Sequence, residues 1–136
     1  MLQLEVITPN GSVLNAEVEQ VTAPGVEGEF QVLPAHLPAL VILGGGKLGY
    51  SIKGDHKVLY LRGGVIEVTQ SAENASEGRV LILAEETQIP GHLDKDRAQQ
   101  LKEAAEAALS NADYITDEKL ARIRQDIDFA EAVLGA

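Results

Sequence analysis

The spacing of apolar residues changes at Pro90-Gly91, and one kind of secondary structure cannot satisfy both spacings. Before this point apolar residues alternate with polar ones, as Leu2 and Leu4 do, which is the two-residue period of a strand. After it they recur every three or four residues, which is the period of a helix. The sequence therefore predicts an α+β chain with a β-sandwich over residues 1–86 and an antiparallel two-helix hairpin over residues 87–136.

The first part consists of short β-rich runs separated by turn residues, which is typical of a sandwich or barrel. Beyond the first two runs, strands are expected at residues 29–33, 48–53, 57–62, 65–69 and 79–84. Glycines suggest where these runs connect, because glycine accepts backbone conformations that other residues avoid. We expect a flexible turn at Gly44-Gly45-Gly46-Lys47, tight connections at Gly54-Asp55 and Gly63-Gly64, and an exposed polar loop over residues 70–78.

The second part has the start signals of two helices. Asp94 is suited to cap the first helix, and the second is expected to begin near Thr116, where acidic residues complement the helix dipole. The expected buried stripes are Ala98, Leu101, Ala105 and Ala108 on the first helix, and Leu120, Ile123, Ile127 and Leu134 on the second. An alanine-rich face buries little area, so the hairpin is expected to be held weakly. It is then either a mobile regulatory element or a plain packing appendage.

Composition excludes several functional classes. The formal net charge of -10 repels phosphate backbones, so nucleic-acid binding is not expected. Cysteine is absent and the three histidines lie in different segments, so neither catalysis nor a metal site is predicted. The first residues lack the basic region of a signal peptide, and the longest apolar run is shorter than the roughly 20 residues of a membrane span. Any membrane association is therefore expected through a partner.

Two charged groups remain as candidate sites. Glu29 precedes a proline-bounded turn that contains His36. The two residues could perform acid/base chemistry or dock a protein; docking is favoured because nothing nearby predicts an oriented pocket. Lys119, Arg122 and Arg124 form a basic cluster on the second predicted helix. By residue pattern alone, this cluster is a solvated helix face.

The segment PGVEGEFQVLPAH, residues 24–36, resembles the signature of the epsilon subunit of F-type ATP synthases. Residues 6–11, 63–68 and 80–85 are similar to further family segments in the same order. The resemblance implies a ten-stranded sandwich and a C-terminal hairpin. It also implies a non-catalytic subunit of the central stalk in a rotary proton-translocating machine, in contact with the gamma subunit and the c-ring. The expected location is the cytoplasmic face of the bacterial inner membrane, peripherally bound, with a thylakoid as the alternative.

The resemblance also implies roles for the candidate residues. Glu29 and His36 match family residues that meet the polar loops of the c-ring. In the family, the hairpin extends along gamma toward an acidic loop of a catalytic beta subunit, beside alpha, and blocks rotation in the hydrolysis direction. Lys119, Arg122 and Arg124 are suited to that contact, although the acidic residues after them predict weak inhibition.

Some bacterial members bind ATP through a segment that Leu93-Asp94-Lys95-Asp96-Arg97-Ala98 matches. That implies an ATP site formed by Leu93, Asp94, Arg97, Ala98 and Arg124. A second arginine of the family site is replaced by Asp128, so one phosphate-facing positive charge is missing. We therefore expect weak ATP binding or none, and no other cofactor.

Two alternatives come from other functional classes. An independent ligand-binding sandwich, such as a carbohydrate module, would need exposed aromatic residues, but tryptophan is absent and aromatic residues make up 4% of the chain. A small hydrolase would use Glu29 and His36 and would turn over ester or phosphate substrates without partners.

Overall fold

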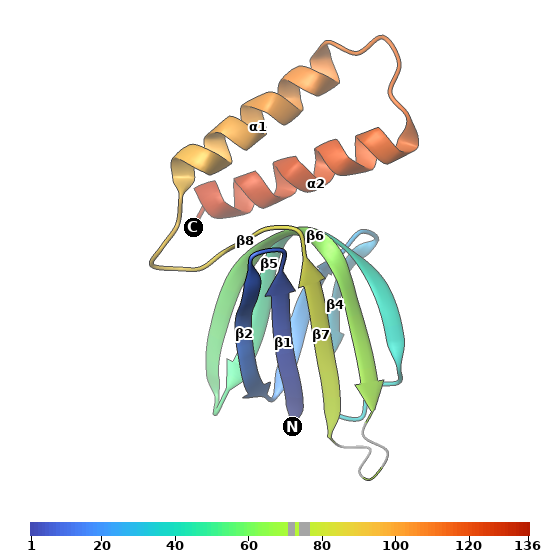
Figure 1. Cartoon of the computed structure of the whole chain (residues 1–136), viewed down its shortest axis with the longest axis vertical. Coiled ribbons are helices and arrows are strands. Elements are labelled where there is room, and N and C mark those ends of the chain that lie inside the picture. The colour runs from blue at the N-terminus through green and yellow to red at the C-terminus, as the bar shows by residue number, and fades with distance from the viewer. Residues whose placement is uncertain (71–72, 74–76) are drawn as a thin grey trace.

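A computed structural model describes residues 1–70, 73 and 77–136, and within these residues the chain forms a sandwich of strands followed by two helices (Figure 1). The strands are β1 (Leu2–Thr8), β2 (Gly11–Val18), β3 (Gln20–Gly25), β4 (Gly28–Val32), β5 (Ala39–Ile52), β6 (Asp55–Gln70), β7 (Gly78–Ala84) and β8 (Thr87–Gln88). The helices are α1 (Lys95–Ser110) and α2 (Asp117–Leu134). This order confirms the predicted α+β fold. Most of the loop predicted at residues 70–78 lies outside the described residues.

All the strands belong to one hydrogen-bonded sheet in the order β2-β1-β7-β6-β5-β3-β4, with β8 paired to β6. The sheet closes into two layers because β5 and β6 are long enough to take part in both. Residues 64–70 of β6 pair with β7, whereas Tyr60 and Leu61 pair with β8. The layers enclose an aliphatic core that includes Leu4, Val21 and Ile66.

Two of the predicted connections were wrong. The glycines at 44–46 lie inside β5, and Gly63-Gly64 lies inside β6. Gly63 and Gly64 have φ of 70° and 130°, values that favour glycine, so they let β6 bend between the layers without ending it. Dividing β5 and β6 at these bends turns eight strands into ten segments, in agreement with the ten-stranded sandwich.

Both helices begin where their caps predict. The Asp94 carboxylate accepts a hydrogen bond from the Arg97 backbone N–H at 2.9 Å, and Thr116 Oγ1 accepts one from the Lys119 N–H at 3.2 Å. The stripe on α1 is confirmed at Ala98, Leu101 and Ala105, which are buried.

The stripe on α2 was partly wrong. Ile123 is buried as predicted, but Leu120 is 37% exposed. The other buried residues of this helix are Phe129, Ala130 and Val133. These three are buried because α2 is covered by α1 on one side and by strands on another, so its apolar surface does not follow a single stripe.

The hairpin lies across one end of the sandwich, with α2 between α1 and the strands (Figure 1). A second apolar cluster joins the two parts: Tyr60 of β6 packs with Ala98 and Leu101 of α1 and with Phe129, Ala130 and Val133 of α2. The closest approach is at Gly45 of β5. A Cβ added there would lie 2.8 Å from the Phe129 backbone nitrogen and would overlap the Gln125 carbonyl oxygen. The backbone of α2 therefore rests directly on that of β5.

Candidate functional site

Charged side chains from four segments meet where the hairpin joins the sandwich. Arg62 of β6 is at the centre: its Nη1 lies 2.8 Å from Glu86 Oε1, and its Nε lies 2.8 Å from Asp126 Oδ1 of α2. The side chains of Arg62 and Asp126 are only 18% and 17% exposed. Burial disfavours the charged guanidinium, but hydrogen bonds and charges from Asp126 and Glu86 outweigh it and raise the pKa of Arg62.

Glu86 extends this network to α1. Its carboxylate accepts two hydrogen bonds from the Arg97 guanidinium, from Nη2 at 3.0 Å and from Nε at 3.3 Å. Burial alone would raise the pKa of Glu86, yet Arg97 and Arg62 together lower it. Bonds with Glu86 and its charge likewise raise the pKa of Arg97. Glu86 therefore remains ionised between two arginines that come from different parts of the fold.

Glu85 makes a second, more exposed link to α2. Its Oε2 accepts hydrogen bonds from Gln125 Nε2 at 3.0 Å and from Arg122 Nη2 at 3.4 Å. Arg122 belongs to the predicted basic cluster, and its side chain is 61% exposed. In the docked hairpin, this member of the cluster is therefore already bound to a carboxylate of the sandwich.

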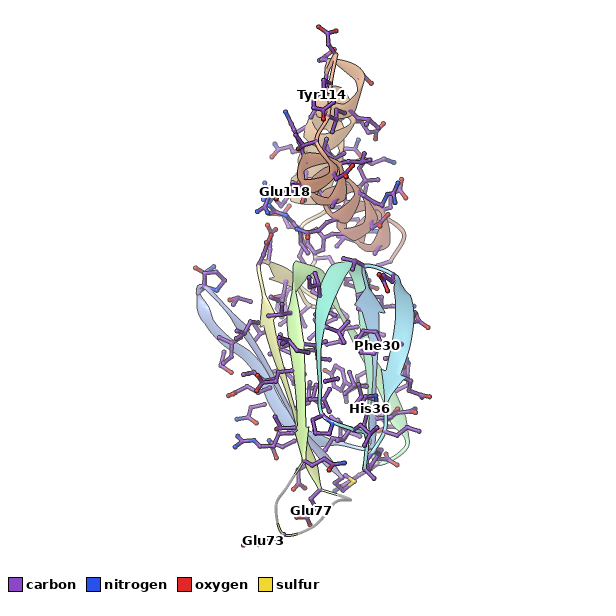
Figure 2. All side chains as sticks on the ribbon, turned by 90° about the vertical axis from the view of Figure 1, so that its right-hand side faces the viewer. Phe30, His36, Glu73, Glu77, Tyr114 and Glu118 are labelled. Carbon is purple, nitrogen blue, oxygen red and sulfur yellow. The ribbon has the colours of Figure 1, made fainter. Side chains whose placement is uncertain are left out.

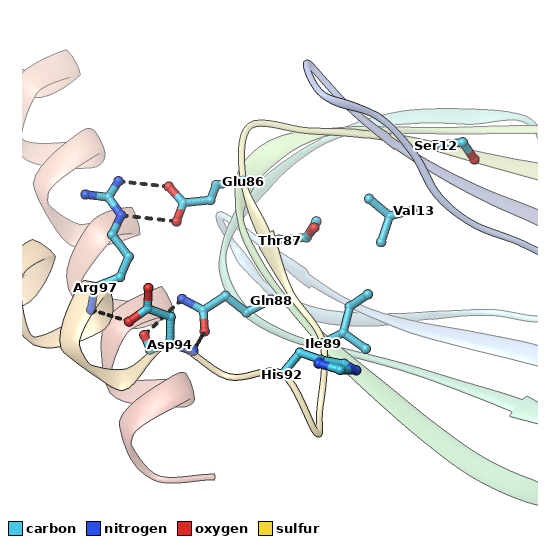
Figure 3. Close-up of a pocket in the computed structure, with 9 residues that line it drawn as sticks. All are labelled: Ser12, Val13, Glu86, Thr87, Gln88, Ile89, His92, Asp94 and Arg97. Carbon is cyan, nitrogen blue, oxygen red and sulfur yellow. Dashed lines mark hydrogen bonds and ion pairs between the residues drawn. The ribbon is translucent and has the colours of Figure 1, made fainter.

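An open pocket of about 600 Å³ lies beside this junction and contains part of the segment that resembles the family's ATP-binding motif (Figure 3). Asp94 and Arg97 line it, together with Gln88 and His92. Gln88 holds Asp94 from both sides: its Oε1 accepts from the Asp94 backbone N–H at 2.8 Å, and its Nε2 donates to the Asp94 carbonyl at 3.2 Å. Figure 3 shows the Arg97 guanidinium turned toward Glu86.

The remaining residues predicted for ATP lie elsewhere. Ala98 is fully buried in the second apolar cluster, and Leu93 packs against that cluster. Arg124 lines a separate cavity of about 130 Å³ between α2 and the strands, with Gln125 and Asp128. The docked hairpin therefore brings Asp94 and Arg97 to one pocket and Arg124 to another.

Asp128 is unfavourably placed in that smaller cavity. Burial and the negative charge of Glu131 raise its pKa, and Arg124 only partly opposes them. The carboxylate thus makes the surroundings of Arg124 less attractive to an anion.

Glu29 and His36 line one groove of about 650 Å³ on the sandwich. The turn that carries His36 is fixed: the His36 N–H donates to the Leu33 carbonyl at 3.0 Å, and Gln70 Nε2 donates to the His36 carbonyl at 3.0 Å. Figure 2 shows His36 toward the end of the sandwich remote from the hairpin, whose tip is marked by Tyr114. The rest of the groove includes exposed aliphatic side chains, among them Leu40 and Ile42.

An apolar row crosses the outer face of the neighbouring strands. The pairing register places Ile42 beside Val65, Val65 beside Leu83, and Leu83 beside Ile7. Ile42 is 62% exposed and Leu83 is 47% exposed, while their chain neighbours Leu43 and Ile82 fill the core. The outer side of four strands therefore presents a continuous aliphatic band, which is typical of a surface that another protein covers.

Sequence reasoning did not single out Arg62, Glu85 or Glu86. Each had a signal: Arg62 interrupts an apolar strand, and the two glutamates follow directly after the last long strand. Those signals do not say which partners the charges have, because the partners lie up to 64 residues away.

Fold and surfaces together define an interaction subunit: a sandwich that presents docking surfaces and carries a hairpin fastened to one end by ion pairs. The family model for the β-sandwich domain of the ATP synthase delta/epsilon chain matches residues 1–90. The chain is 37% identical over 131 residues to the ATP synthase epsilon chain of Nitratidesulfovibrio vulgaris strain DP4, covering 96% of this chain and 84% of the relative. It is 39% identical over 108 residues to ATP synthase epsilon chain 2 of Syntrophotalea carbinolica, with coverage of 79% and 73%. The chain belongs to the ATP synthase delta/epsilon family.

Solved structures share the fold. A chain of the Euglena gracilis mitochondrial ATP synthase, from a structure of OSCP, F1 and c-ring, matches 98% of this chain and 79% of its own length with a TM-score of 0.71 at 22% identity. A chain from the central stalk and c-ring of the Tetrahymena thermophila enzyme matches 98% of this chain and 96% of its own with a TM-score of 0.65 at 14% identity.

Family membership confirms the predicted resemblance and makes the chain a non-catalytic subunit of an ATP synthase complex. It also decides against the independent ligand-binding module and the small hydrolase. In the described part of the chain, neither helix is long and apolar enough to cross a membrane.

Proposed function

We propose that this subunit joins the gamma subunit to the c-ring in the central stalk and restrains ATP hydrolysis through its hairpin. The observation that carries the proposal is the division of the molecule. The sandwich presents a broad outer surface that the rest of the chain leaves open, while the hairpin is a separate element docked through a small cluster and a few ion pairs. A rigid sandwich that binds the stalk and a hairpin that can leave it suit a subunit that both couples gamma to the c-ring and regulates ATP hydrolysis.

The apolar row formed by Ile7, Ile42, Val65 and Leu83 is the proposed gamma-binding surface. These side chains lie side by side across four strands, and burying such a band gives association its main driving force. Glu5 and Glu67 stand on the adjoining register row, so a partner with basic residues beside its apolar patch would fit best.

The groove that contains Glu29 and His36 is the proposed contact with the c-ring. One acid and one histidine beside exposed aliphatic residues provide both polar and apolar contacts for the loops of the ring. The hydrogen bonds that fix the His36 turn favour this role, because a preorganised loop loses little entropy on binding.

The basic cluster Lys119, Arg122 and Arg124 is the proposed contact with an acidic loop of a beta subunit, beside alpha, once the hairpin extends. All three residues are exposed, so charge attraction would add specificity and speed to binding more than affinity. We place the assembled subunit on the cytoplasmic face of the bacterial inner membrane, with a thylakoid membrane as the alternative.

For ATP, we propose weak binding or none. Arg97 already makes a two-bond contact with Glu86, and Arg124 lies in another pocket next to Asp128. To bind both arginines, a nucleotide would therefore have to displace the Glu86 carboxylate from Arg97, and Arg124 would have to leave its own cavity. Calorimetry that detected tight ATP binding by the purified chain would refute this.

The test is ATP hydrolysis by a complex of alpha, beta and gamma subunits with the full chain added. Replacing Arg122 and Arg124 together by alanine is expected to relieve inhibition while the chain still binds gamma. Lys47→Ala with Lys57→Ala is a matched control, because it removes two exposed positive charges from the sandwich. Equal relief by both pairs, or loss of gamma binding in the hairpin variant, would contradict the division of roles.

A further inference from the structure

We propose that Glu85 and Glu86 form an acidic latch: they hold, in the docked hairpin, the same arginines that would otherwise face an acidic partner or a phosphate. The role of those arginines toward partners rests on the function proposed above. The latch itself concerns only the equilibrium between docked and released hairpin, so it can be tested in this chain alone.

The latch is rigidly attached to the sandwich. Glu85 and Glu86 lie between β7 and β8, and their backbone is bonded to β6: the Glu85 N–H donates to the Gly63 carbonyl at 3.3 Å, and the Glu86 carbonyl accepts from the Arg62 N–H at 2.9 Å. Both carboxylates are thus fixed to the body of the molecule. Glu86 also pairs with Arg62 of the sandwich, whereas the other partners, Arg97, Arg122 and Gln125, belong to the hairpin.

The charges of the junction are balanced within the junction. Arg62, Arg97 and Arg122 face Glu85, Glu86 and Asp126. The rest of the chain opposes docking, because outside these six residues each part is acidic: residues 1–86 contain 9 acidic and 4 basic residues, and residues 87–136 also contain 9 acidic and 4 basic ones. Two acidic parts repel each other at long range, so these local pairs are needed to offset that repulsion.

The contacts of the latch exclude the contacts proposed for partners. Arg97 presents its Nε and Nη2 to the two oxygens of Glu86, which is the geometry that guanidinium groups also use for phosphate. Arg122 is bound to a carboxylate, the same chemical group that an acidic loop would offer. The chain therefore competes with its own partners for both arginines while the hairpin is docked.

The latch is placed where it can open. Arg122 and Arg97 are substantially exposed, so water and salt reach their ion pairs. The more buried pair of Arg62 with Asp126 sits behind them and holds α2 directly. The remaining interface consists of the apolar cluster, the Gln88–Asp94 hydrogen bonds and the contact of α2 with β5 at Gly45, and losing the ion pairs shifts the equilibrium toward the released hairpin.

The experiment measures how often the hairpin opens in the full chain. The sequence has no cysteine, so Val133→Cys introduces a single thiol in the cluster shared with Tyr60, at a fully buried position. The rate of alkylation of this thiol is then proportional to the open fraction. In this background, Glu86→Gln is expected to label about tenfold faster, and Glu85→Gln about twofold to threefold faster.

Glu103→Gln is the matched control, because Glu103 is an exposed hairpin residue whose carboxylate accepts a hydrogen bond from Gln99 of the same helix. It removes one negative charge and should leave the labelling rate unchanged. High salt should accelerate labelling of the parent chain more than that of Glu86→Gln, since the parent has more charge pairs to screen.

Unchanged labelling of Glu86→Gln, or equal acceleration by Glu103→Gln, would overturn the latch. If Glu86→Gln disturbs the sandwich, as judged by its circular dichroism, Glu85→Gln decides: labelling no faster than that of the parent chain also overturns the proposal. The variant Glu85→Gln with Glu86→Gln is then added to the alpha, beta and gamma complex. Stronger inhibition of ATP hydrolysis supports both the latch and the inhibitory role of the hairpin. Faster labelling with unchanged inhibition supports the latch and contradicts the inhibitory role of the hairpin.

Discussion

Replacing Gly45 by alanine should release the hairpin without disturbing the sandwich. Gly45 lies in β5 without the positive φ that would require glycine, so alanine fits the strand backbone. The added methyl group would overlap the Gln125 carbonyl oxygen and lie 2.8 Å from the Phe129 nitrogen. Both atoms belong to the backbone of α2, so no side-chain rotation can relieve the overlap.

The size of the effect follows from overpacking. Inserting a methylene-sized group into a packed interface costs about 1–3 kcal/mol. If the cost falls on docking alone, the open fraction rises about 5- to 150-fold, because 1.4 kcal/mol corresponds to a factor of ten. The sandwich should keep its stability, since its core contains neither Gln125 nor Phe129.

The assay is thiol alkylation at Val133→Cys, with Gly44→Ala as the control. Gly44 precedes Gly45 in the same strand, but a Cβ there would lie 3.8 Å from its nearest neighbour, the Gly25 carbonyl oxygen, which is an ordinary contact. We expect fast labelling for Gly45→Ala and parent-like labelling for Gly44→Ala. Similar rates in the two variants would refute the direct seating of α2 on β5.

Two further predictions concern the ion pairs and the apolar row. The pKa of Glu86 is lowered in the folded chain, so its stabilisation of docking is complete above the ordinary glutamate pKa of about 4.3 and is lost as the pH falls through the lower folded value. Hydrogen exchange of α2 between neutral and acid pH should therefore show opening at low pH in the parent and a flatter profile in Glu86→Gln; parallel profiles would count against it. Leu83→Asp should weaken gamma binding at least about tenfold by calorimetry, because it puts an unpaired charge into the apolar row and lies outside the groove of Glu29 and His36. Tyr114→Asp at the hairpin tip serves as the control, and equal weakening by both would argue against the apolar row.

Local signals in the sequence were enough for the elements of this fold. Alternation gave the strands, three- and four-residue spacing gave the helices, and the side chains of Asp94 and Thr116 cap the helices where expected. The wrong predictions were the chain connections expected at two groups of glycines. Gly44–Gly46 and Gly63-Gly64 resemble turns in a linear sequence, but they bend strands that continue into the second layer.

For the candidate sites, too, the sequence placed nearby residues correctly and distant ones incorrectly. Residues near each other in the sequence were brought together as expected: Glu29 and His36 share a groove, and Asp94 and Arg97 share a pocket. Arg124 was grouped with Arg97 by family resemblance, and the docked hairpin keeps it in a different cavity. The proposed roles of all these residues remain predictions.

By itself, the sequence determined the two-part architecture, the starts of the helices and the family, because periods, N-caps and signature segments are local. Only the tertiary structure decided which surface of α2 is covered, why Gly45 must lack a side chain, and how Arg62, Glu85 and Glu86 fasten the hairpin. The physical reason is that a period identifies residues on one face without identifying the neighbour that covers it. An ion pair between Arg62 and Asp126 exists only once 64 residues of chain have folded between them.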